Sequence, residues 1–144
     1  MLYLGIDPGL TGAYAIIYGD VIEVHKFVDI HTCADTLRFK DIKLAAIERV
    51  HAFPKAGVSG MFNFGTNFGM WQGLLAGLSI PYILVQPKEW QKKILDAIKT
   101  AANKKPSVGF VQRRYPELNL KKSQHNEADA LCLVLYAKAN NDNR

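Results

Sequence analysis

Three acidic residues stand where their carboxylates could bind a divalent cation. Asp7 and Glu48 each end a short apolar segment that we predict to be a strand, and Asp129 lies in the first turns of a predicted C-terminal helix. Ligand sites of open α/β sheets form at the carboxyl ends of strands. If these two strands are neighbours, about 4.8 Å apart, both carboxylates can reach one hard cation. An acid in an apolar helical segment is costly unless it is paired or bound to metal.

The residues before Asp129 add to this donor set. His125 and Asn126 lie four and three positions before Asp129, so both share its helix face, whereas Glu127 is expected to point elsewhere. Oxygen-rich ligands of this kind suit Mg²⁺ or Mn²⁺ rather than zinc.

Each of these residues also has an ordinary structural explanation. An Asp before Pro-Gly is a common turn residue, Glu48 beside Arg49 is consistent with a surface ion pair, and Asp129 with a solvent-facing helix residue. His125 is equally typical of a helix N-terminus. Only the joint placement of the acids favours a metal site.

The excess positive charge of the chain lies in one stretch. The net charge is +5, yet residues 86–122 hold ten Lys or Arg against three acids, a net of +7. Such a block is typical of phosphate binding, because Lys and Arg displace counterions from a nucleic acid. A solvated helical face is the alternative. The candidate phosphate contacts are Lys88, Lys92, Lys93, Lys104, Lys105, Arg113 and Arg114.

The pattern of apolar residues predicts an α/β sheet with helices on its faces. The expected strands are Leu2–Asp7, Gly12–Tyr18, Val21–Phe27, Leu44–Glu48 and Tyr82–Val85. The expected helices are Ala34–Lys40, Phe68–Leu78, Pro87–Lys99, Val108–Tyr115 and one from an N-cap at Ser123 to about Asn140. Between them, His51–Thr66 is expected to be a glycine-containing loop.

Length and composition favour one globular domain over residues 1–144, with a disordered tail at about 140–144. An acid within the first seven residues and the lack of a basic start argue against a signal peptide. No apolar run reaches the roughly 20 residues of a membrane helix. Cys33 and Cys132 stand far apart in unlike contexts, which favours a reducing cytoplasm. Dinucleotide-binding, P-loop and zinc-protease motifs are absent.

Several segments together resemble one nuclease family. Gly5–Gly12 (GIDPGLTG), Ile47-Glu48 and Glu127–Leu131 (EADAL) are similar to the RuvC-type Holliday junction resolvases. The stretch 48–55 (ERVHAFPK), with Phe62–Gly65 and Pro87-x-x-Trp90, resembles the phage-encoded branch of that family. The similarity spans about residues 2–136.

The resemblance implies a ribonuclease-H-like fold, with a five-stranded mixed sheet of order 3-2-1-4-5 flanked by helices. It also implies a homodimer that nicks four-way DNA junctions in pairs, in a bacterial or phage-infected cell. Asp7, Glu48 and Asp129 match the metal-binding acids, with Asp7 bridging two cations roughly 3.5–4 Å apart. Where relatives often carry a fourth acid, this chain offers His125 or Asn126, and we favour His125.

Aromatic residues after Glu48 are candidates for sensing the branch point. Phe53, beside Lys55, is expected to stack on exposed bases, which is worth about 1–3 kcal/mol per base. Phe62 and Phe64 could do the same, but core positions are the more common explanation for them. Glycines at 69, 73 and 77 would let a second subunit approach, unless that helix packs on its own sheet.

Other functions stay open at this point. An actin-like ATPase or sugar kinase also opens on an Asp-x-Gly turn, but it needs two such lobes. A branched-nucleic-acid-binding module with weak or no catalysis is conceivable because the fourth acid is missing. A replication-fork or flap nuclease, serving recombination, repair or genome packaging, is a further alternative.

Overall fold

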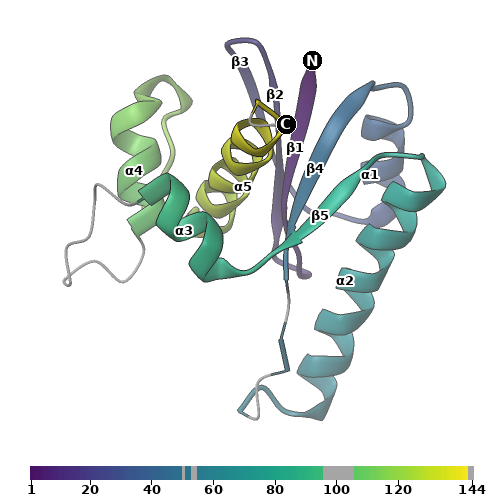
Figure 1. The fold of residues 1–144 in the computed structure, drawn as a ribbon. Helices are drawn as coiled ribbons and strands as arrows, with labels where there is room; N and C mark the ends of the chain where they lie inside the picture. Colours follow the sequence, from purple (N-terminus) through teal and green to yellow (C-terminus); the bar gives the residue numbers. More distant parts are fainter. Residues whose placement is uncertain (50, 53–54, 96–105, 143–144) are drawn as a thin grey trace.

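The computed structural model describes residues 1–49, 51–52, 55–95 and 106–142 of the 144-residue chain (Figure 1). Its strands are β1 (Leu2–Asp7), β2 (Ala13–Tyr18), β3 (Val21–Lys26), β4 (Ile42–Glu48) and β5 (Tyr82–Val85). Its helices are α1 (Ile30–Leu37), α2 (Val58–Gly77), α3 (Pro87–Leu95), α4 (Pro106–Arg114), the short 3₁₀ helix η2 (Pro116–Leu118) and α5 (His125–Asp142).

The five strands form one mixed sheet in the order β3-β2-β1-β4-β5, as predicted. β1, β2 and β3 pair antiparallel, whereas β1–β4 and β4–β5 pair parallel. Ile6 of β1 lies opposite Ile47 of β4, and each strand has one more residue, Asp7 and Glu48. Parallel strands end at the same edge of a sheet, so the register alone brings these two acids side by side.

Alternation along the central strands builds two cores, one on each face of the sheet. Tyr3 and Leu44 belong to the core under α3, α4 and α5, while Leu4 and Ile47 belong to the core under α1 and α2. Figure 1 shows these two groups of helices on opposite sides of the sheet. The sheet therefore has a helical layer on each face, and its edge remains available for a site.

Helix α5 lies directly on β1. A Cβ atom added at Gly5 would be 2.2 Å from both the Ala130 carbonyl oxygen and the Val134 backbone nitrogen. Only a residue without a side chain allows this approach of strand and helix backbones. The close contact fixes where the first turns of α5, with Asp129, lie relative to β1.

Two helices begin earlier than predicted. α1 begins at Ile30 rather than Ala34 because the Asp29 side chain caps it, accepting a 2.8 Å hydrogen bond from the Thr32 backbone N–H. α2 begins at Val58, so residues 58–66 of the predicted loop are helical. Glycine costs about 1 kcal/mol in a helix, which weakened the sequence signal there. Trp71 and Leu75, both buried against the sheet, show that tertiary packing overrides this cost.

The last helix extends further towards the C-terminus than predicted. α5 continues to Asp142, so residues 140–142, expected in a disordered tail, are helical. Lys93 Nζ donates a 2.7 Å hydrogen bond to Asn140 Oδ1, and Asn141 Nδ2 donates a 3.1 Å bond to the Tyr3 hydroxyl. These bonds tie the last helical turn to α3 and β1.

Neither cysteine is part of a disulfide: Cys33 and Cys132 are both buried and free, in the cores on opposite faces of the sheet. Across the part of the chain that the structure describes, no helix combines the length and apolar character needed to cross a membrane.

Candidate functional site

The three acids predicted from the sequence gather at one end of the sheet. Asp7 ends β1, Glu48 ends β4, and Asp129 lies in the second turn of α5. Asp7 is only 8% exposed, which makes it the sole charged residue counted as buried in the described ranges. Glu48 and Asp129 are half-buried.

Four carboxylates influence one another here, those of Asp7, Glu48, Asp129 and Glu127, and a negative charge on all four is electrostatically unfavourable. The pKa of Asp7 is raised to about 9, first because burial removes water from the carboxylate, and then because the charges of Glu48, Asp129 and Glu127 repel it. Burial likewise raises the pKa of Glu48, opposed by a hydrogen bond from Trp90. A cation placed among these carboxylates would relieve the repulsion.

The charge of Glu127 also reaches Asp7. We expected this residue to point away from the face that carries Asp129, and its charge is the smallest of the causes that raise the pKa of Asp7. The site thus has a fourth acid within electrostatic reach, although not at the position where we looked for one.

Two neighbours that the sequence analysis did not assign to the site hold the outer acids. The Trp90 indole Nε1 donates a 2.7 Å hydrogen bond to Glu48 Oε2, and the Ser107 hydroxyl donates a 2.5 Å bond to Asp129 Oδ1. Trp90 came to notice only through the Pro87-x-x-Trp90 similarity, and nothing in the sequence marks Ser107. The surface ion pair considered for Glu48 and Arg49 is not among the salt bridges of the described residues.

The donor chemistry fits a hard divalent cation. The carboxylates of Asp7, Glu48 and Asp129 supply oxygen ligands, and the buried, repelled state of Asp7 is relieved by positive charge. Within the described ranges, however, no three acidic, His or Cys side chains already converge as a metal site. The Trp90 and Ser107 bonds each use one oxygen of Glu48 and Asp129, so neither bond prevents a cation from binding the second oxygen of that carboxylate.

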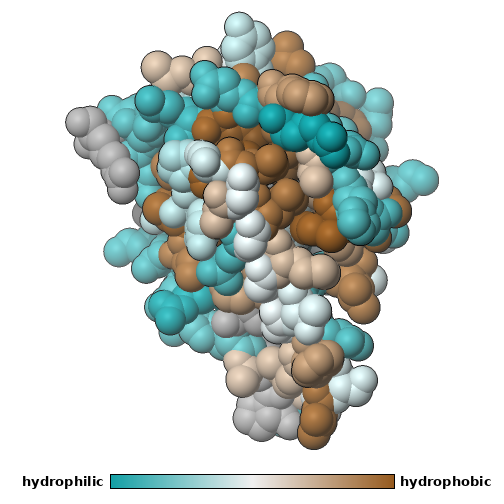
Figure 2. All heavy atoms as spheres, turned by 90° about the vertical axis from the view of Figure 1, so that its right-hand side faces the viewer, coloured by the Kyte–Doolittle hydropathy of each residue, from teal (hydrophilic) through white to brown (hydrophobic). Residues whose placement is uncertain are grey.

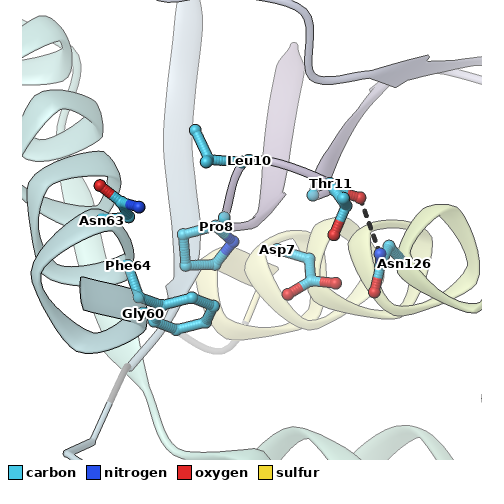
Figure 3. Close-up of a pocket in the computed structure, with 10 residues that line it drawn as sticks. Asp7, Pro8, Leu10, Thr11, Gly60, Asn63, Phe64 and Asn126 are labelled. Atoms are coloured by element: carbon cyan, nitrogen blue, oxygen red, sulfur yellow. Dashed lines mark hydrogen bonds between the residues drawn. The ribbon is translucent and has the colours of Figure 1, made fainter. Parts of the chain in front are cut away.

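Of the two candidates for a further ligand, Asn126 is the one that lies beside Asp7. Its Nδ2 donates a 2.7 Å hydrogen bond to the Thr11 carbonyl oxygen, and its side chain lines a cavity together with Asp7 (Figure 3). His125 Nδ1 lies 3.0 Å from the Ser123 carbonyl oxygen, and His125 does not line that cavity. Asn126 thus shares the cavity with Asp7, whereas His125, which we preferred from the sequence, does not; a ligand role for either residue stays a prediction.

The turn after Asp7 is held by a buried residue that the sequence analysis missed. Asn67 of α2 is fully buried, and its Oδ1 accepts a 2.7 Å hydrogen bond from the Gly9 backbone N–H. Gly9 has a φ of 134°, which only glycine adopts readily. Asn67 and Asn126 thus fix the loop 8–12 from two helices, one on each side.

A cavity of about 330 Å³ opens beside Asp7, between this loop and the start of α2. Figure 3 shows Asn63 and Phe64 on α2 across the cavity from Pro8. Its lining residues are Asp7, Pro8, Gly9, Leu10, Thr11, Gly12, Gly60, Asn63, Phe64 and Asn126.

The predicted DNA-contacting residues are only partly placed. Lys55, Lys88, Lys92, Lys93, Arg113 and Arg114 are exposed. Lys93 also lies over the Tyr136 ring, 5.1 Å from its centroid. Phe53, Lys104 and Lys105 lie outside the described residues. Phe62 is 74% exposed, so the core explanation for it is wrong, while Phe64 is half-buried at the cavity.

Comparison with known proteins finds likeness in structure but not in sequence. No protein-family model and no curated protein sequence matches the chain. Two structures of Thermus thermophilus RuvC match it with TM-scores of 0.65 and 0.64, at 19% and 18% identity. They cover 94% of this chain and 92% and 91% of theirs, and the second contains a Holliday junction substrate. Fowlpox virus resolvase bound to Holliday junction DNA matches with a TM-score of 0.55 at 15% identity, covering 95% and 99%. The chain therefore has the RuvC-like, ribonuclease-H-like fold that its sequence motifs predicted.

Proposed function

We propose that this protein is a divalent-metal-dependent endonuclease that nicks branched DNA, with four-way junctions as its main substrate. The observation that carries the proposal is the buried Asp7 carboxylate, whose pKa is raised to about 9 among three other acids. An ionised carboxylate is costly to bury, so this place favours either a protonated Asp7 or a cation bound to it. The likeness of fold to two resolvases solved with Holliday junctions supports DNA as the substrate.

Asp7, Glu48 and Asp129 would hold the cations, Mg²⁺ or Mn²⁺, with the Oδ1 of Asn126 close by. The chemistry that two such ions supply when bound is a lowered pKa for the attacking water and stabilisation of the leaving 3′-oxygen. The chain's own residues orient the acids. Trp90 and Ser107 donate hydrogen bonds to Glu48 and Asp129, and Asn67 holds the turn that follows Asp7.

A homodimer is part of the proposal, because a two-fold-symmetric pair can present two sites to two equivalent phosphates. Helix α2 supports it. The helix has 20 residues and no charged side chain, yet only Asn67, Trp71 and Leu75 are buried. Its outer face carries exposed Val58 and Phe62 and glycines at 65, 69, 73 and 77. Figure 2 views the molecule from the side on which α2 lies, and pale to brown residues run down the middle of that face.

The exposed cations of α3 and α4 would bind the DNA backbone, together with Lys55. Each phosphate neutralised adds to the slope of log affinity against log salt concentration. Arg113→Ala with Arg114→Ala should flatten that slope by about two units if both contact phosphates. An unchanged slope would remove the end of α4 from the interface.

The test of the proposal is a nicking assay on four-way, three-way, flap and linear DNA with Mg²⁺, Mn²⁺ or chelator. We expect metal-dependent paired nicks in the four-way junction and none in linear duplex. Asp7→Asn should lower the rate at least a thousandfold while junction binding survives. Asp35→Asn, an exposed acid paired with Arg38 on α1, is the matched control and should nick at the wild-type rate.

Three outcomes would change the assignment. Junction binding without cleavage in any metal would favour a binding module that has lost catalysis. Faster cleavage of flaps or forks than of four-way junctions would favour a debranching nuclease. Wild-type activity of Asp7→Asn would remove the acid cluster from the chemistry.

A further inference from the structure

Trp90 and Ser107 reach the acid cluster from the buried sides of two different helices. Trp90 of α3 is 1% exposed and Ser107 of α4 is 3% exposed, so the protein encloses both side chains. The indole Nε1 donates to Glu48 Oε2 at 2.7 Å, and the hydroxyl donates to Asp129 Oδ1 at 2.5 Å. Each bond therefore engages one oxygen of a candidate metal ligand.

The two donors differ in how firmly they hold their carboxylates. An indole N–H can only donate, and a hydrogen bond to an ionised carboxylate is about twice as strong as one between neutral groups. Trp90 belongs to the same apolar core as Val85 and Leu95, so its ring is fixed by packing. A serine hydroxyl can rotate, and it can accept as well as donate. Trp90 therefore holds its carboxylate more firmly than Ser107 does.

Divalent cations differ in how they use carboxylate oxygens. Ca²⁺ takes about six to eight oxygen ligands and often binds both oxygens of one carboxylate. Mg²⁺ demands a near-ideal octahedron, keeps several waters and is usually bound through only one or two carboxylates. A carboxylate with one oxygen held by a rigid donor can offer its other oxygen to Mg²⁺. It is a poorer ligand for Ca²⁺, whose larger shell gains most from a carboxylate that binds with both oxygens.

We propose that Trp90 and Ser107 are positioning residues that set the metal selectivity of this site. By engaging one oxygen of Glu48 and one of Asp129, they oppose binding of a cation through both oxygens of either carboxylate, which disfavours Ca²⁺ relative to Mg²⁺. The inference rests on the proposed metal-dependent function and deepens it, because it assigns the choice of ion to two residues outside the ligand set. Trp90 carries the larger share, since its donor cannot rotate.

The first experiment measures binding of the metal alone, without DNA. The melting temperature of the whole protein is followed as MgCl₂ or CaCl₂ is added, which gives a dissociation constant for each ion. Trp90→Phe keeps an aromatic ring in the core but lacks the N–H. We expect its Mg²⁺ dissociation constant to rise about tenfold, a usual cost of losing the outer partner of a metal ligand. Its Ca²⁺ dissociation constant should stay within about twofold, because the released carboxylate can bind Ca²⁺ with both oxygens.

Trp71→Phe is the matched control. Trp71 is also a fully buried tryptophan, but it lies in the core on the opposite face of the sheet, and its Nε1 has no hydrogen-bond partner among the described residues. The substitution removes the same atoms from a core without touching an acid. The preference between the two ions should therefore equal that of wild type, whatever the loss of stability.

Ser107 provides a second and smaller test. Ser107→Ala removes only the hydroxyl and should shift the ratio of the two dissociation constants in the same direction as Trp90→Phe, by a smaller factor. Ser107→Thr keeps a hydroxyl and should restore the wild-type ratio. If Trp90→Phe does not fold, this pair of variants decides the question by the same ratio.

Inhibition of nicking gives an independent measure of selectivity. Ca²⁺ is added at a fixed Mg²⁺ concentration, and the Ca²⁺ concentration that halves the nicking rate is compared between proteins. We expect this concentration to be about tenfold lower for Trp90→Phe than for wild type or Trp71→Phe, in line with the weakened Mg²⁺ binding.

The outcomes separate this inference from the function it rests on. If neither ion shifts the melting of wild type and no metal supports nicking, the proposed function fails. If wild type binds Mg²⁺ but Trp90→Phe weakens both ions by the same factor, or weakens neither, the selectivity inference is wrong while the metal-dependent function stands. An equal shift of the ratio in Trp71→Phe would trace the effect to core packing and would also overturn the inference.

Discussion

Helices α5 and α2 cover opposite faces of the same sheet in very different ways. α5 buries seven of its 18 residues, whereas α2 buries three of its 20. α5 also brings the charges of Glu127 and Asp129 towards Asp7, while α2 brings only uncharged side chains. Yet each helix sends one asparagine to the loop after Asp7. The difference is that α5 contributes acidic groups near Asp7 from a helix packed tightly on the sheet, while α2 leaves an uncharged face exposed.

The largest effect is expected from a glycine-to-alanine change on β1, where α5 packs against it. Gly5→Ala would place its Cβ 2.2 Å from two backbone atoms of α5, neither of which can turn aside. We expect a loss of about 3 kcal/mol or more in the free energy of unfolding, the upper range for overpacking. Chemical denaturation measures it. A loss below about 1 kcal/mol would mean that α5 shifts easily on β1.

The next largest effect is on the pH dependence of stability, because the acids of α5 help to raise the pKa of Asp7. In chelator, folded wild-type protein keeps a proton on Asp7 up to about pH 9, whereas the unfolded chain loses it near pH 3.8. Because the folded state binds the extra proton, stability falls as pH rises through this window, by about 1.4 kcal/mol per pH unit at most. Asp7→Asn lacks this term, so its advantage over wild type should grow from pH 5 to pH 9.

Thermal melting of both proteins across that pH range, with and without Mg²⁺, tests the prediction. Mg²⁺ should stabilise wild type more than Asp7→Asn, since ligand binding to the folded state raises its stability. Parallel pH profiles for the two proteins would contradict the raised pKa of Asp7.

Removing the hydrogen bonds of Asn67 and Asn126 to the loop after Asp7 should lower the free energy of unfolding by an intermediate amount. Asn67→Leu leaves the Gly9 N–H without its acceptor in a fully buried place, which should cost about 1–3 kcal/mol. Asn126→Ala removes a more exposed bond and should cost about 0.5–1.5 kcal/mol. We expect Asn67→Leu to slow cleavage more as well, because the turn behind Asp7 loses its support. Equal costs would mean that burial does not distinguish the two contacts.

The smallest expected effect is a gain rather than a loss in the free energy of unfolding. A Cβ at Gly69, on the outer face of α2, meets nothing within 4 Å. Gly69→Ala should therefore stabilise the monomer by about 0.5–1 kcal/mol through helix propensity. If α2 pairs with a second copy, the same change should weaken the dimer, which sedimentation equilibrium would show. Stabilisation with unchanged association would place the dimer interface elsewhere.

Local patterns of apolar residues in the sequence predicted the strands, the two strand-end acids and the helical acid, and the order of the strands in the sheet followed from the family resemblance of the motifs. Asp7, Glu48 and Asp129 were found this way, and their placement at one sheet edge is confirmed. The sequence misjudged the start of α2, since six glycines in and before that helix hide a periodicity that only contact with the sheet rewards.

Only the tertiary structure decided which residues surround the acids. Asn67, Trp90 and Ser107 lie 58, 42 and 22 positions from their partners, and no local pattern encodes such contacts. It also showed that Asn126 hydrogen-bonds the loop after Asp7, a contact that the helix face shared by His125 and Asn126 does not encode. The sequence identifies the carboxylates. The repulsion between them arises only because folding excludes water from Asp7 and brings the strands and α5 together.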